Sequence, residues 1–538
     1  MPLSVTNTNI ITGLKTLPGT AVTVSGSTID LSLGDHFTKT VSGDTTFSVT
    51  NIPTDSRNVT FIVELVSGSS AVVNWWSSIK WKNGVAPRLS QRDIIKFSLV
   101  DGTWYGVHFG QSLKSVENSH WINIFGTPYD YNYGIAVDSF GNVYTSGYTN
   151  SQVGSNYKFL IVKYNTAGVL QWQRTLGSTG ESGYDIAVDS SGNVYVSGET
   201  STQGAGGYDA LIAKYDTNGT LQWQRTLGGA DYEGGYGIAV DSSGNVYVTG
   251  STFSQGAGSA DDIIIAKYNT SGTLQWQRTL GGADVGQLHS VAVDSSGNVY
   301  ITGETYSQGA GNGDILIAKY NTSGTLQWQR TLGGASFDYG QGVTVDSSGN
   351  VYVTGSTFSQ GAGNGDVLIA KYNTNGTLQW QRTLGGADSD VGYRIAVDSS
   401  GNVYITGYTS SQGAGSNDVI IAKYDTSGVL QWQRTLGGAG GDYAEDIAVD
   451  SFGNVYITGY GGAQGNFGCI VAKLPGDGSG TGAYFNNTLY YLESTLTSAT
   501  STLTDQASTL TDQASTLTDQ ASTLTSAASN FLSAQVIV

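Results

Sequence analysis

The chain has 538 residues, enough for several domains, and its 42 acidic residues against 24 basic ones give a net charge of −18. This acidic balance argues against nucleic-acid binding, which requires clustered lysine and arginine. The single cysteine, Cys469, excludes a disulfide framework within the chain. No apolar run is long enough to cross a membrane, and the first residues lack a signal-peptide pattern, so we expect neither membrane insertion nor signal-directed secretion.

The N-terminal region, residues 1–113, predicts a separate small β domain. Runs rich in β-branched and aromatic residues recur between turn residues, as in 59–65 and 94–99. This order of strands and turns indicates a β-sandwich-like fold. Trp75 and Trp76 are adjacent, so one of them faces inward on a strand and packs in the core, while the other faces out. Residues 114–119 form a linker to the next domain.

Several segments of this region resemble a module of virion and tail-fibre-like proteins of marine cyanobacterial phages. The matching segments are Gly26–Leu31, Gly34–Phe37, Gly43–Phe47, Trp75-Trp76 with its flanks, and Asp101–Trp104. The resemblance implies a phage structural component in which this domain contacts other virion proteins.

The middle of the chain is built from one repeated unit. The sequence Gly-Asn-Val-Tyr recurs at intervals of 51 to 53 residues, ending at Tyr144, Tyr195, Tyr247, Tyr300, Tyr352, Tyr404 and Tyr456. In the unit that starts at Tyr236, four strand-like runs are separated by two tight turns and one Gly/Ser/Gln-rich loop. Seven repeats of four antiparallel strands predict a mostly β protein whose centre is a seven-bladed β-propeller.

A second marker, Gln-Trp-Gln-Arg, occurs six times rather than seven. The last unit ends at Leu474 without this strand, and a similar segment, residues 120–126, stands before the first unit. We therefore expect residues 120–126 to form the outer strand of the last blade and to close the ring, so that the propeller spans residues 120–474. An open solenoid is the alternative, but closure removes the exposed strand edge.

These repeats resemble the SBBP-type β-propeller repeat. The resemblance rests on the Asp-Ser-x-Gly-Asn-Val-Tyr hairpin followed by an Ala-Lys-Tyr strand, and it covers residues 120–474. It implies the propeller fold and leaves the function open, because propellers host many activities.

A Gly-rich linker, residues 475–488, leads to a Ser/Thr-rich tail, residues 489–538. Leucines recur every seven residues in the tail, and alanines fall four positions after a leucine. This 4,3 alternation predicts a coiled coil, most naturally in a homotrimer. Ser and Thr are weak helix formers, so a disordered linker is the alternative. The apolar series is Leu496, Leu503, Leu510, Leu517, Leu524 and Phe531.

No catalytic motif accompanies the four histidines, His36, His108, His120 and His289. Glu181, Glu233 and Glu445 could supply carboxylates for glycoside hydrolysis, but nothing in the sequence pairs two of them. Seven nearly equal repeats lack the single asymmetric constellation that catalysis requires. We therefore expect no enzyme, no cofactor and no metal site.

The loops that enter the blades differ from copy to copy, whereas the hairpin turns hardly vary. These loops carry aromatic and short polar residues on a glycine background, a mixture suited to sugars. Neutral drift at unconstrained positions is the alternative. The residues predicted to contact a glycan are Tyr232, Tyr236, His289, Phe337, Tyr339, Tyr393 and Tyr443.

Together, these features predict a phage virion protein, a tail-fibre-like or other appendage component whose propeller binds a host-surface polysaccharide or receptor. An architectural virion decoration without receptor binding, in the capsid, neck or tail, is one alternative. A cellular propeller adhesin is another.

Overall fold

The computed structural model divides the chain into two compact units, residues 1–119 and 120–538, and each is described by itself. In the first unit the structure describes residues 22–24, 28–31, 36–41, 45–50, 58–67, 73–74, 79–81, 92–100 and 103–111. In the second it describes 120–126, 130–150, 157–177, 179–256, 261–282, 285–461, 468–484, 489–507, 511–514, 518–521, 526–528 and 533–537.

The described part of the N-terminal unit consists of strands. They are β1 (Val22–Thr23), β2 (Thr28–Asp30), β3 (His36–Val41), β4 (Thr45–Thr46), β5 (Ser48–Thr50), β6 (Asn58–Ser67), β7 (Val73–Asn74), β8 (Ile79–Trp81), β9 (Arg92–Val100) and β10 (Thr103–Gln111). Six of them form one mixed sheet in the order β1-β3-β6-β9-β10-β8, and β2 with β5 and β4 with β7 form two short parallel pairs.

The predicted sandwich is not confirmed in this unit. Neighbours β1, β3 and β6 run parallel, with Val22 opposite Phe37 and Phe37 opposite Val63. Parallel neighbours need a crossover, and the short strands β2, β4 and β5 lie in these crossovers. Phe37 and Val63 are buried, and so are Ile29 of β2 and Phe47 between β4 and β5. The Trp75–Trp76 pair lies outside the described residues.

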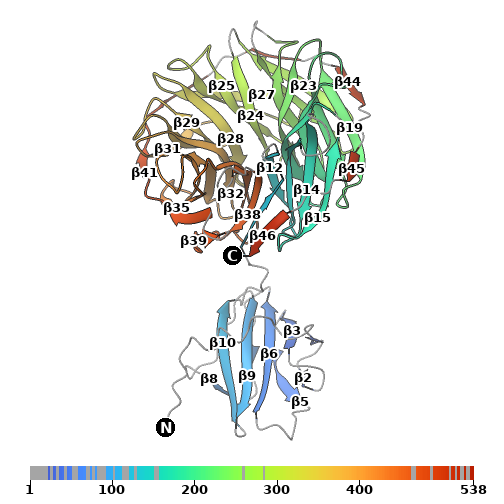
Figure 1. Ribbon diagram of the computed structural model, residues 1–538, viewed down its shortest axis with the longest axis vertical. Helices are drawn as coiled ribbons and strands as arrows, with labels where there is room; N and C mark the ends of the chain where they lie inside the picture. Colours follow the sequence, from blue (N-terminus) through green and yellow to red (C-terminus); the bar gives the residue numbers. More distant parts are fainter. Residues whose placement is uncertain are drawn as a thin grey trace. The chain divides into compact units, whose positions relative to one another are not determined.

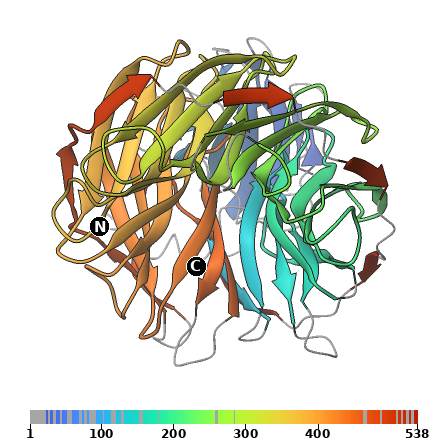
Figure 2. The same ribbon diagram turned by 90° about the horizontal axis from the view of Figure 1, so that it is seen from above.

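The second unit contains seven four-stranded blades, drawn from cyan to orange in Figures 1 and 2. Blades 1 to 3 are β12 (Tyr131–Val137), β13 (Val143–Thr149), β14 (Lys158–Tyr164) and β15 (Leu170–Leu176); β16 (Glu181–Val188), β17 (Val194–Thr200), β18 (Asp209–Tyr215) and β19 (Leu221–Gly228); and β20 (Glu233–Val240), β21 (Val246–Thr252), β22 (Asp262–Tyr268) and β23 (Leu274–Gly281). Blades 4 and 5 are β24 (Val285–Val293), β25 (Val299–Thr305), β26 (Asp314–Tyr320) and β27 (Leu326–Gly333); and β28 (Asp338–Val345), β29 (Val351–Thr357), β30 (Asp366–Tyr372) and β31 (Leu378–Gly385). Blade 6 is β32 (Asp390–Val397), β33 (Val403–Thr409), β34 (Asp418–Tyr424) and β35 (Leu430–Gly437), and blade 7 is β36 (Tyr443–Val449), β37 (Val455–Gly461), β38 (Gly468–Leu474) and β11 (Trp121–Phe125).

The repeated hairpin motif is a structural device. The Asp241 carboxylate accepts hydrogen bonds from the backbone N–H groups of Ser243 and Asn245, both at 2.9 Å, and from the Tyr247 hydroxyl at 3.1 Å. Gly244 has a φ of +78°, a conformation that favours glycine, and it closes the turn. The motif therefore builds the turn and anchors a buried tyrosine in every blade.

The ring is closed by the strand that precedes the first repeat. β11 pairs antiparallel with β38, with Trp121 opposite Lys473 and Phe125 opposite Cys469. Trp121 is fully buried, and its indole N–H donates to the carbonyl of Thr166 in blade 1 at 3.1 Å. The last blade thus takes its fourth strand from the start of the propeller, which leaves no unpaired blade.

The described residues from 482 onward contain strands and no helix, so they do not show the predicted coiled coil. The strands are β39 (Gly482–Tyr484), β40 (Leu489–Glu493), β41 (Thr497–Thr500), β42 (Thr504–Ala507), β43 (Thr511–Ala514), β44 (Thr518–Ala521), β45 (Ser526–Ala528) and β46 (Ser533–Ile537). β39 falls in the predicted linker 475–488 and pairs with β40. β40 to β45 pair in turn with the outer strands of blades 6, 5, 4, 3, 2 and 1, and β46 pairs with β11 of blade 7. The tail thus encircles the propeller as a fifth strand of each blade, and its red strands lie on the outer rim in Figures 1 and 2.

The heptad has a physical meaning in this arrangement. A seven-residue extended step spans about 23 Å and carries the tail from one blade edge to the next. Leu496 and Leu503 are 4% and 5% exposed and pack in the hydrophobic clusters between neighbouring blades. The outer strands offer unpaired backbone groups, and threonine suits a strand better than a helix. Leu510, Leu517, Leu524 and Phe531 lie outside the described residues.

Glutamines of the repeat recognise the tail in the same way twice. In blade 6, Gln433 donates to the carbonyl of Leu496 at 2.9 Å, and Gln412 donates to the Thr495 hydroxyl at 2.8 Å. In blade 5, Gln381 and Gln360 make the same two bonds to Leu503 and Thr502, at 3.0 and 2.8 Å. The heptad period of the tail thus matches the blade period of the propeller.

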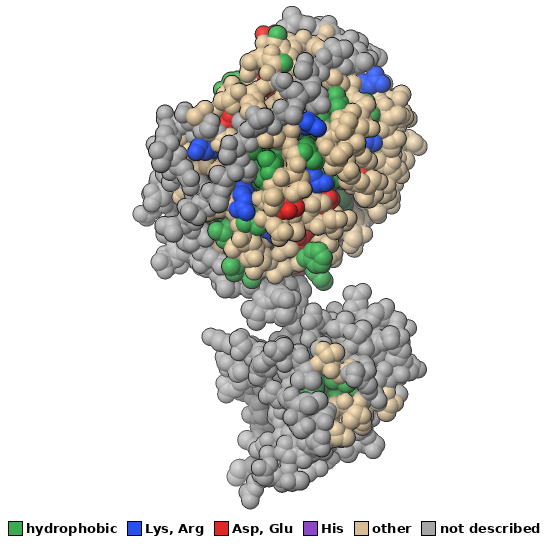
Figure 3. Space-filling view, turned by 90° about the vertical axis from the view of Figure 1, so that its right-hand side faces the viewer, with side chains coloured by type: hydrophobic (Ala, Val, Ile, Leu, Met, Phe, Trp, Pro, Cys, Tyr) green, Lys and Arg blue, Asp and Glu red, His purple; other side chains and the backbone are tan. Residues whose placement is uncertain are grey.

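The described part of the face drawn in Figure 3 carries few charged side chains and several separate hydrophobic ones. Figure 3 shows scattered basic and acidic side chains on a surface that is mostly tan. Within the described residues, no helix is long and apolar enough to cross a membrane.

Candidate functional site

Each inner strand carries a β-bulge at the same place, beside the axis of the propeller. The pairing of β20 with β21 shifts between Gly235 and Gly237, so that Tyr236 is the extra residue. The same shift occurs in all seven blades. A bulge bends the strand and redirects a side chain. The bulged residues are Tyr133, Tyr184, Tyr236, His289, Gln341, Tyr393 and Glu445, which we call the axial ring.

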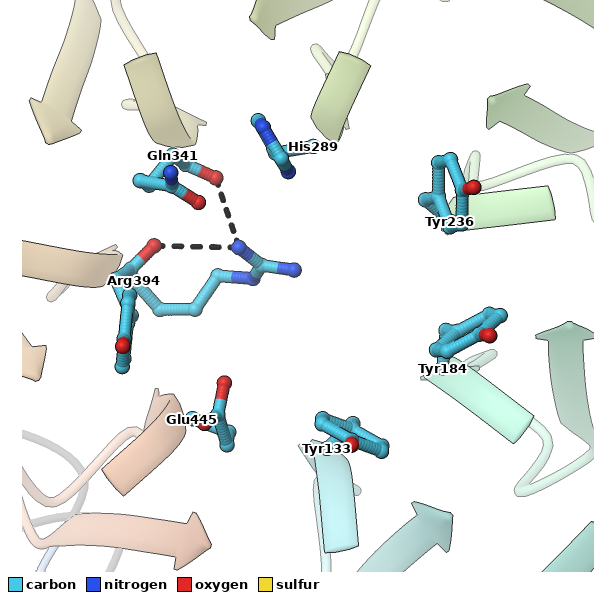
Figure 4. A pocket seen from close by; sticks show the side chains of 8 residues that line it. Tyr133, Tyr184, Tyr236, His289, Gln341, Arg394 and Glu445 are labelled. Atoms are coloured by element: carbon cyan, nitrogen blue, oxygen red, sulfur yellow. Dashed lines mark hydrogen bonds between the residues drawn. The ribbon is translucent and has the colours of Figure 1, made fainter. Parts of the chain in front are cut away.

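The axial ring lines a cavity of about 250 Å³, to which Arg394 also contributes. Figure 4 shows that its two sides differ. Tyr133, Tyr184 and Tyr236 of blades 1 to 3 form an aromatic arc, and the opposite side carries His289, Gln341, Arg394 and Glu445 together with one further tyrosine, Tyr393. The cavity therefore offers three tyrosine rings on one side, and on the other mainly hydrogen-bonding groups with the single ring of Tyr393.

The aromatic arc is held by ring contacts and by one carboxylate. The ring centres of Tyr133 and Tyr184 lie 5.8 Å apart, and those of Tyr184 and Tyr236 lie 5.3 Å apart with an edge-on geometry. The Tyr184 hydroxyl donates to Glu199 at 2.8 Å. Burial raises the pKa of the phenols of Tyr133, Tyr184 and Tyr236, so all three remain protonated at neutral pH.

The polar arc contains one fixed positive charge. The Arg394 guanidinium donates to the backbone carbonyl of Gln341 in blade 5 at 2.8 Å and to that of Tyr393 at 3.2 Å, as drawn in Figure 4. Burial raises the pKa of Glu445 to about 7, an effect that Arg394 and a hydrogen bond with Tyr460 partly offset. Glu445 can therefore accept or donate a hydrogen bond near neutral pH.

A second layer of side chains follows directly after the axial ring and ties the blades together. Asp185 of blade 2 accepts a hydrogen bond from the backbone N–H of Ile238 in blade 3 at 2.8 Å. Asp446 of blade 7 accepts one from Ile135 of blade 1 at 2.7 Å. Burial raises the pKa of both carboxyls, and for Asp446 the nearby Asp185 adds to the effect. The hydrogen bonds of these two acids connect neighbouring blades. Among the described residues, no group of three potential metal ligands occurs.

The structure separates the seven predicted site residues into two groups. Tyr236, His289 and Tyr393 belong to the axial ring. The Tyr232 hydroxyl lies 2.8 Å from that of Tyr236, so it adjoins the ring without lining the cavity. The remaining three lie outside the cavity lining: Phe337 stacks on Tyr339 at 6.0 Å, and Tyr443 packs against Tyr408 and Tyr460 at 5.2 and 5.1 Å.

The residues predicted from sequence to contact a glycan did not include Tyr133, Tyr184, Gln341, Arg394 and Glu445. The sequence does contain a signal for the axial ring. Each unit contains the pattern Ile/Val-Ala/Thr-Val, and the axial-ring residue stands two positions before the Ile or Val that begins it. Glu233, another candidate acid, binds its own loop by accepting hydrogen bonds from the backbone N–H of Gly229 and from the Thr252 hydroxyl. Glu181 does the same with Thr179 and Thr202.

Family comparison agrees with the fold. The model described as "Beta-propeller repeat" (SBBP) matches residues 121–153, 171–203, 222–254, 275–309, 327–359, 379–413 and 431–468. A propeller domain of unknown function, DUF5122, matches residues 190–221, 295–326 and 347–378. The module suggested for the N-terminal region is not shown by these matches.

Two curated proteins are similar over part of the chain. The "Uncharacterized WD repeat-containing protein L264" of Acanthamoeba polyphaga mimivirus is 22% identical over 367 residues, covering 47% of this chain and 26% of the relative. The "Regulatory protein FlaEY" of Caulobacter vibrioides is 26% identical over 231 residues, covering 38% of this chain and 24% of the relative. The chain thus spans about a quarter of the length of these relatives.

The solved structures that match the chain include a gluconolactonase of Xanthomonas campestris, 14% identical with a TM-score of 0.33, covering 56% of this chain and 90% of that one. Sqt1 of Chaetomium thermophilum is 11% identical with a TM-score of 0.39, covering 65% and 96%. A puromycin hydrolase is 12% identical with a TM-score of 0.34, covering 69% and 54%.

The expectation that the chain is not an enzyme is corrected by this comparison. It rested on the near-equality of the repeats and on missing motifs, yet the solved structures that match the chain include two enzymes, a gluconolactonase and a puromycin hydrolase. Repeats by themselves do not exclude catalysis, because one differing residue per blade can build an asymmetric site. At these identities and TM-scores the likeness assigns no activity.

Proposed function

We propose that this chain, whose residues 121–468 carry SBBP β-propeller repeats, binds a sugar ring of a glycan in its axial cavity. The observation that carries the proposal is the division of the axial ring into an aromatic arc and a polar arc. A sugar ring has the matching two-sidedness: its C–H face packs on aromatic rings, and its hydroxyls take hydrogen bonds from polar groups.

The size of the cavity limits the ligand. At about 250 Å³ it is slightly smaller than the ~300–1,000 Å³ of sites for drug-sized molecules. One sugar residue fits this volume, so the cavity holds one residue or the end of a longer glycan.

The charges of the polar arc favour a neutral ligand. Arg394 is positive, and Glu445, with its pKa of about 7, is partly ionised near neutral pH. Opposite charges on the same arc leave little net charge to attract an ion, whereas donors and acceptors side by side suit neutral hydroxyl groups.

The biological setting we propose is a phage tail fibre or other virion appendage whose propeller binds a host-surface polysaccharide. Its support is the resemblance of the N-terminal segments to cyanobacterial phage modules, through which the chain would contact other virion proteins. The proposed homotrimer loses its structural basis, because the described tail strands pair with the blades of their own chain. An architectural virion role with an inert propeller is the competing function.

Binding of polysaccharide fragments from candidate host cells to the full chain, measured by calorimetry, tests the proposal. Tyr133→Ala removes one wall of the cavity and should weaken binding by about 1 kcal/mol or more, roughly five- to tenfold. Ser242→Ala, in an exposed hairpin turn, is the control and should bind like the wild type. Equal affinity of the Tyr133→Ala variant and the wild type, or no binding of any glycan, would support the architectural role.

A further inference from the structure

A second, larger cavity opens in blade 3 beside the axial ring. It has a volume of about 630 Å³ and is lined by Asp231, Tyr232, Tyr236, Phe253 and Asp261. Only Tyr236 also lines the axial cavity. The combination of three aromatic side chains with two carboxylates distinguishes its chemistry from that of the axial cavity.

A glycine lets two tyrosines of this cavity approach each other. Two positions before the axial ring, the seven blades carry Tyr131, Ser182, Gly234, Gln287, Tyr339, Val391 and Tyr443. Blade 3 alone has glycine there. A Cβ atom at Gly234 would lie 2.7 Å from the Tyr236 ring and 3.0 Å from the Tyr232 hydroxyl. The missing side chain lets these two tyrosines come together and form one wall.

The aromatic walls meet at a corner. The rings of Tyr232 and Phe253 are 5.7 Å apart and nearly perpendicular, at 85°. Tyr208 lies 5.7 Å from Tyr232 on another side. Phe253 and Tyr208 are 51% and 41% exposed, so their ring faces remain available to a ligand.

The phenols of the wall are held by a buried carboxylate. The Tyr232 hydroxyl donates to Glu199 at 2.5 Å and shares a hydrogen bond of 2.8 Å with the Tyr236 hydroxyl. Glu199 is 8% exposed and lies behind the aromatic wall. A phenol that donates to a carboxylate has a more electron-rich ring, which strengthens its attraction for a cation.

The charge of this cavity has one sign. Asp231 and Asp261 are part of its lining, Glu199 lies behind it, and none of the described lining residues is lysine or arginine. The net charge of −18 adds a general attraction for cations. Perpendicular aromatic faces with flanking carboxylates are the recognised means of binding ammonium groups.

We propose that the blade-3 cavity binds an organic ammonium group, either the quaternary ammonium of a choline-type compound or the primary ammonium of an amino sugar. The cation lies against Tyr232 and Phe253, and Asp231 and Asp261 balance its charge. This site goes beyond the proposed glycan site and does not depend on it, because the axial cavity recognises a neutral ring.

Titration of the full chain with choline chloride, followed by calorimetry or ligand-observed NMR, tests the proposal. Two further compounds are titrated in parallel: 3,3-dimethylbutanol, which is the neutral isostere of choline, and glucosamine, which carries a primary ammonium group. We expect choline or glucosamine to bind at least tenfold more tightly than the neutral isostere. A preference for choline identifies a quaternary ammonium, and a preference for glucosamine identifies an amino sugar. The proposal is overturned if the neutral isostere binds as tightly as the cations. It is also overturned if neither cation binds at a concentration on the order of 10 mM.

The chain supplies a matched control. Phe358 of blade 5 occupies the same loop position as Phe253 and is 44% exposed, but it lies outside the blade-3 cavity. Phe253→Ala should weaken ammonium binding at least fivefold, and Phe358→Ala should leave it unchanged. Asp231→Asn with Asp261→Asn should weaken it similarly and reduce its salt dependence. Equal losses in the Phe253→Ala and Phe358→Ala variants would contradict the site, and retention of ammonium binding by Tyr133→Ala would show that it is independent of the axial cavity.

Discussion

The outer rim and the axis of the propeller use the same repeat in opposite ways. At the rim, blades 5 and 6 bind successive tail heptads through equivalent glutamines and equivalent buried leucines. At the axis, the equivalent position carries Tyr, His, Gln or Glu according to the blade. The rim and the turns therefore contribute to stability, and they do so in the same way in each copy of the repeat. The axis is where we propose ligand binding, because differences between the copies create an asymmetric site there.

The tail leucines should show the largest effect on stability. Leu496→Ala and Leu503→Ala each remove a buried side chain between two blades and should lower the free energy of unfolding by about 2–5 kcal/mol. Urea denaturation measures the loss, and light scattering measures the mass in parallel. We expect no change of mass, because the leucines pack on their own chain.

Leu492→Ala is the control for this comparison, since Leu492 is on a tail strand but is 37% exposed. It should change the free energy of unfolding by less than about 1 kcal/mol. An oligomer that dissociates in the Leu496→Ala variant would restore the coiled-coil interpretation of the tail.

The hairpin turns should show a smaller effect that is equal from blade to blade. Asp241→Ala and Asp346→Ala each remove the acceptor of two backbone N–H groups, a side-chain amide and a tyrosine hydroxyl. Each should lower the free energy of unfolding by about 1–3 kcal/mol and leave ligand binding unchanged. Losses that differ by more than 2 kcal/mol between the two blades would show that the turns are not equivalent.

The smallest effect that we expect is on the pH dependence of the free energy of unfolding, which should differ between the hairpin turns and the axis. At the turn, burial acts to raise the pKa of Asp346, but hydrogen bonds from Asn350 and Tyr352 outweigh it and the pKa is lowered. This contribution is present above the unfolded pKa and is lost in acid. At the axis, burial raises the pKa of Glu445 to about 7, so its contribution is present below the unfolded pKa and is lost as pH rises through 7.

We therefore expect the wild type to have a higher free energy of unfolding at pH 5 than at pH 8. A shift of one pKa unit corresponds to about 1.4 kcal/mol, and contact of Glu445 with solvent in the cavity reduces its effect. We therefore expect Glu445→Gln to reduce this difference by roughly 1 kcal/mol. Asp346→Asn should instead change the loss of stability below pH 4. An unchanged difference in the Glu445→Gln variant would mean that Glu445 is not buried at the axis.

Recognition of the axial cavity from sequence was partial for a specific reason. The loop residues Phe337, Tyr339 and Tyr443 attracted attention because they vary and are aromatic, but they pack against other aromatic rings outside the cavity lining. Tyr133 and Gln341 lie inside strands, where a side chain normally alternates between two faces. The bulge breaks that alternation, and although its position in the repeat is constant, no single residue type identifies it as a bulge.

The sequence by itself determined the blade, because every contact that shapes it is local. The Asp241 turn, its glycine and the alternating strands lie within a few residues of each other and recur with the period. It also determined the closing strand, because a missing strand at one end and an extra one at the other can be counted. Only the tertiary structure decided the fate of the tail. A leucine every seven residues fixes a spacing and not a conformation, and the spacing suits a helical seam as well as the step between blade edges. The unpaired outer strands, with glutamines placed to bind Leu496 and Leu503, selected the extended form.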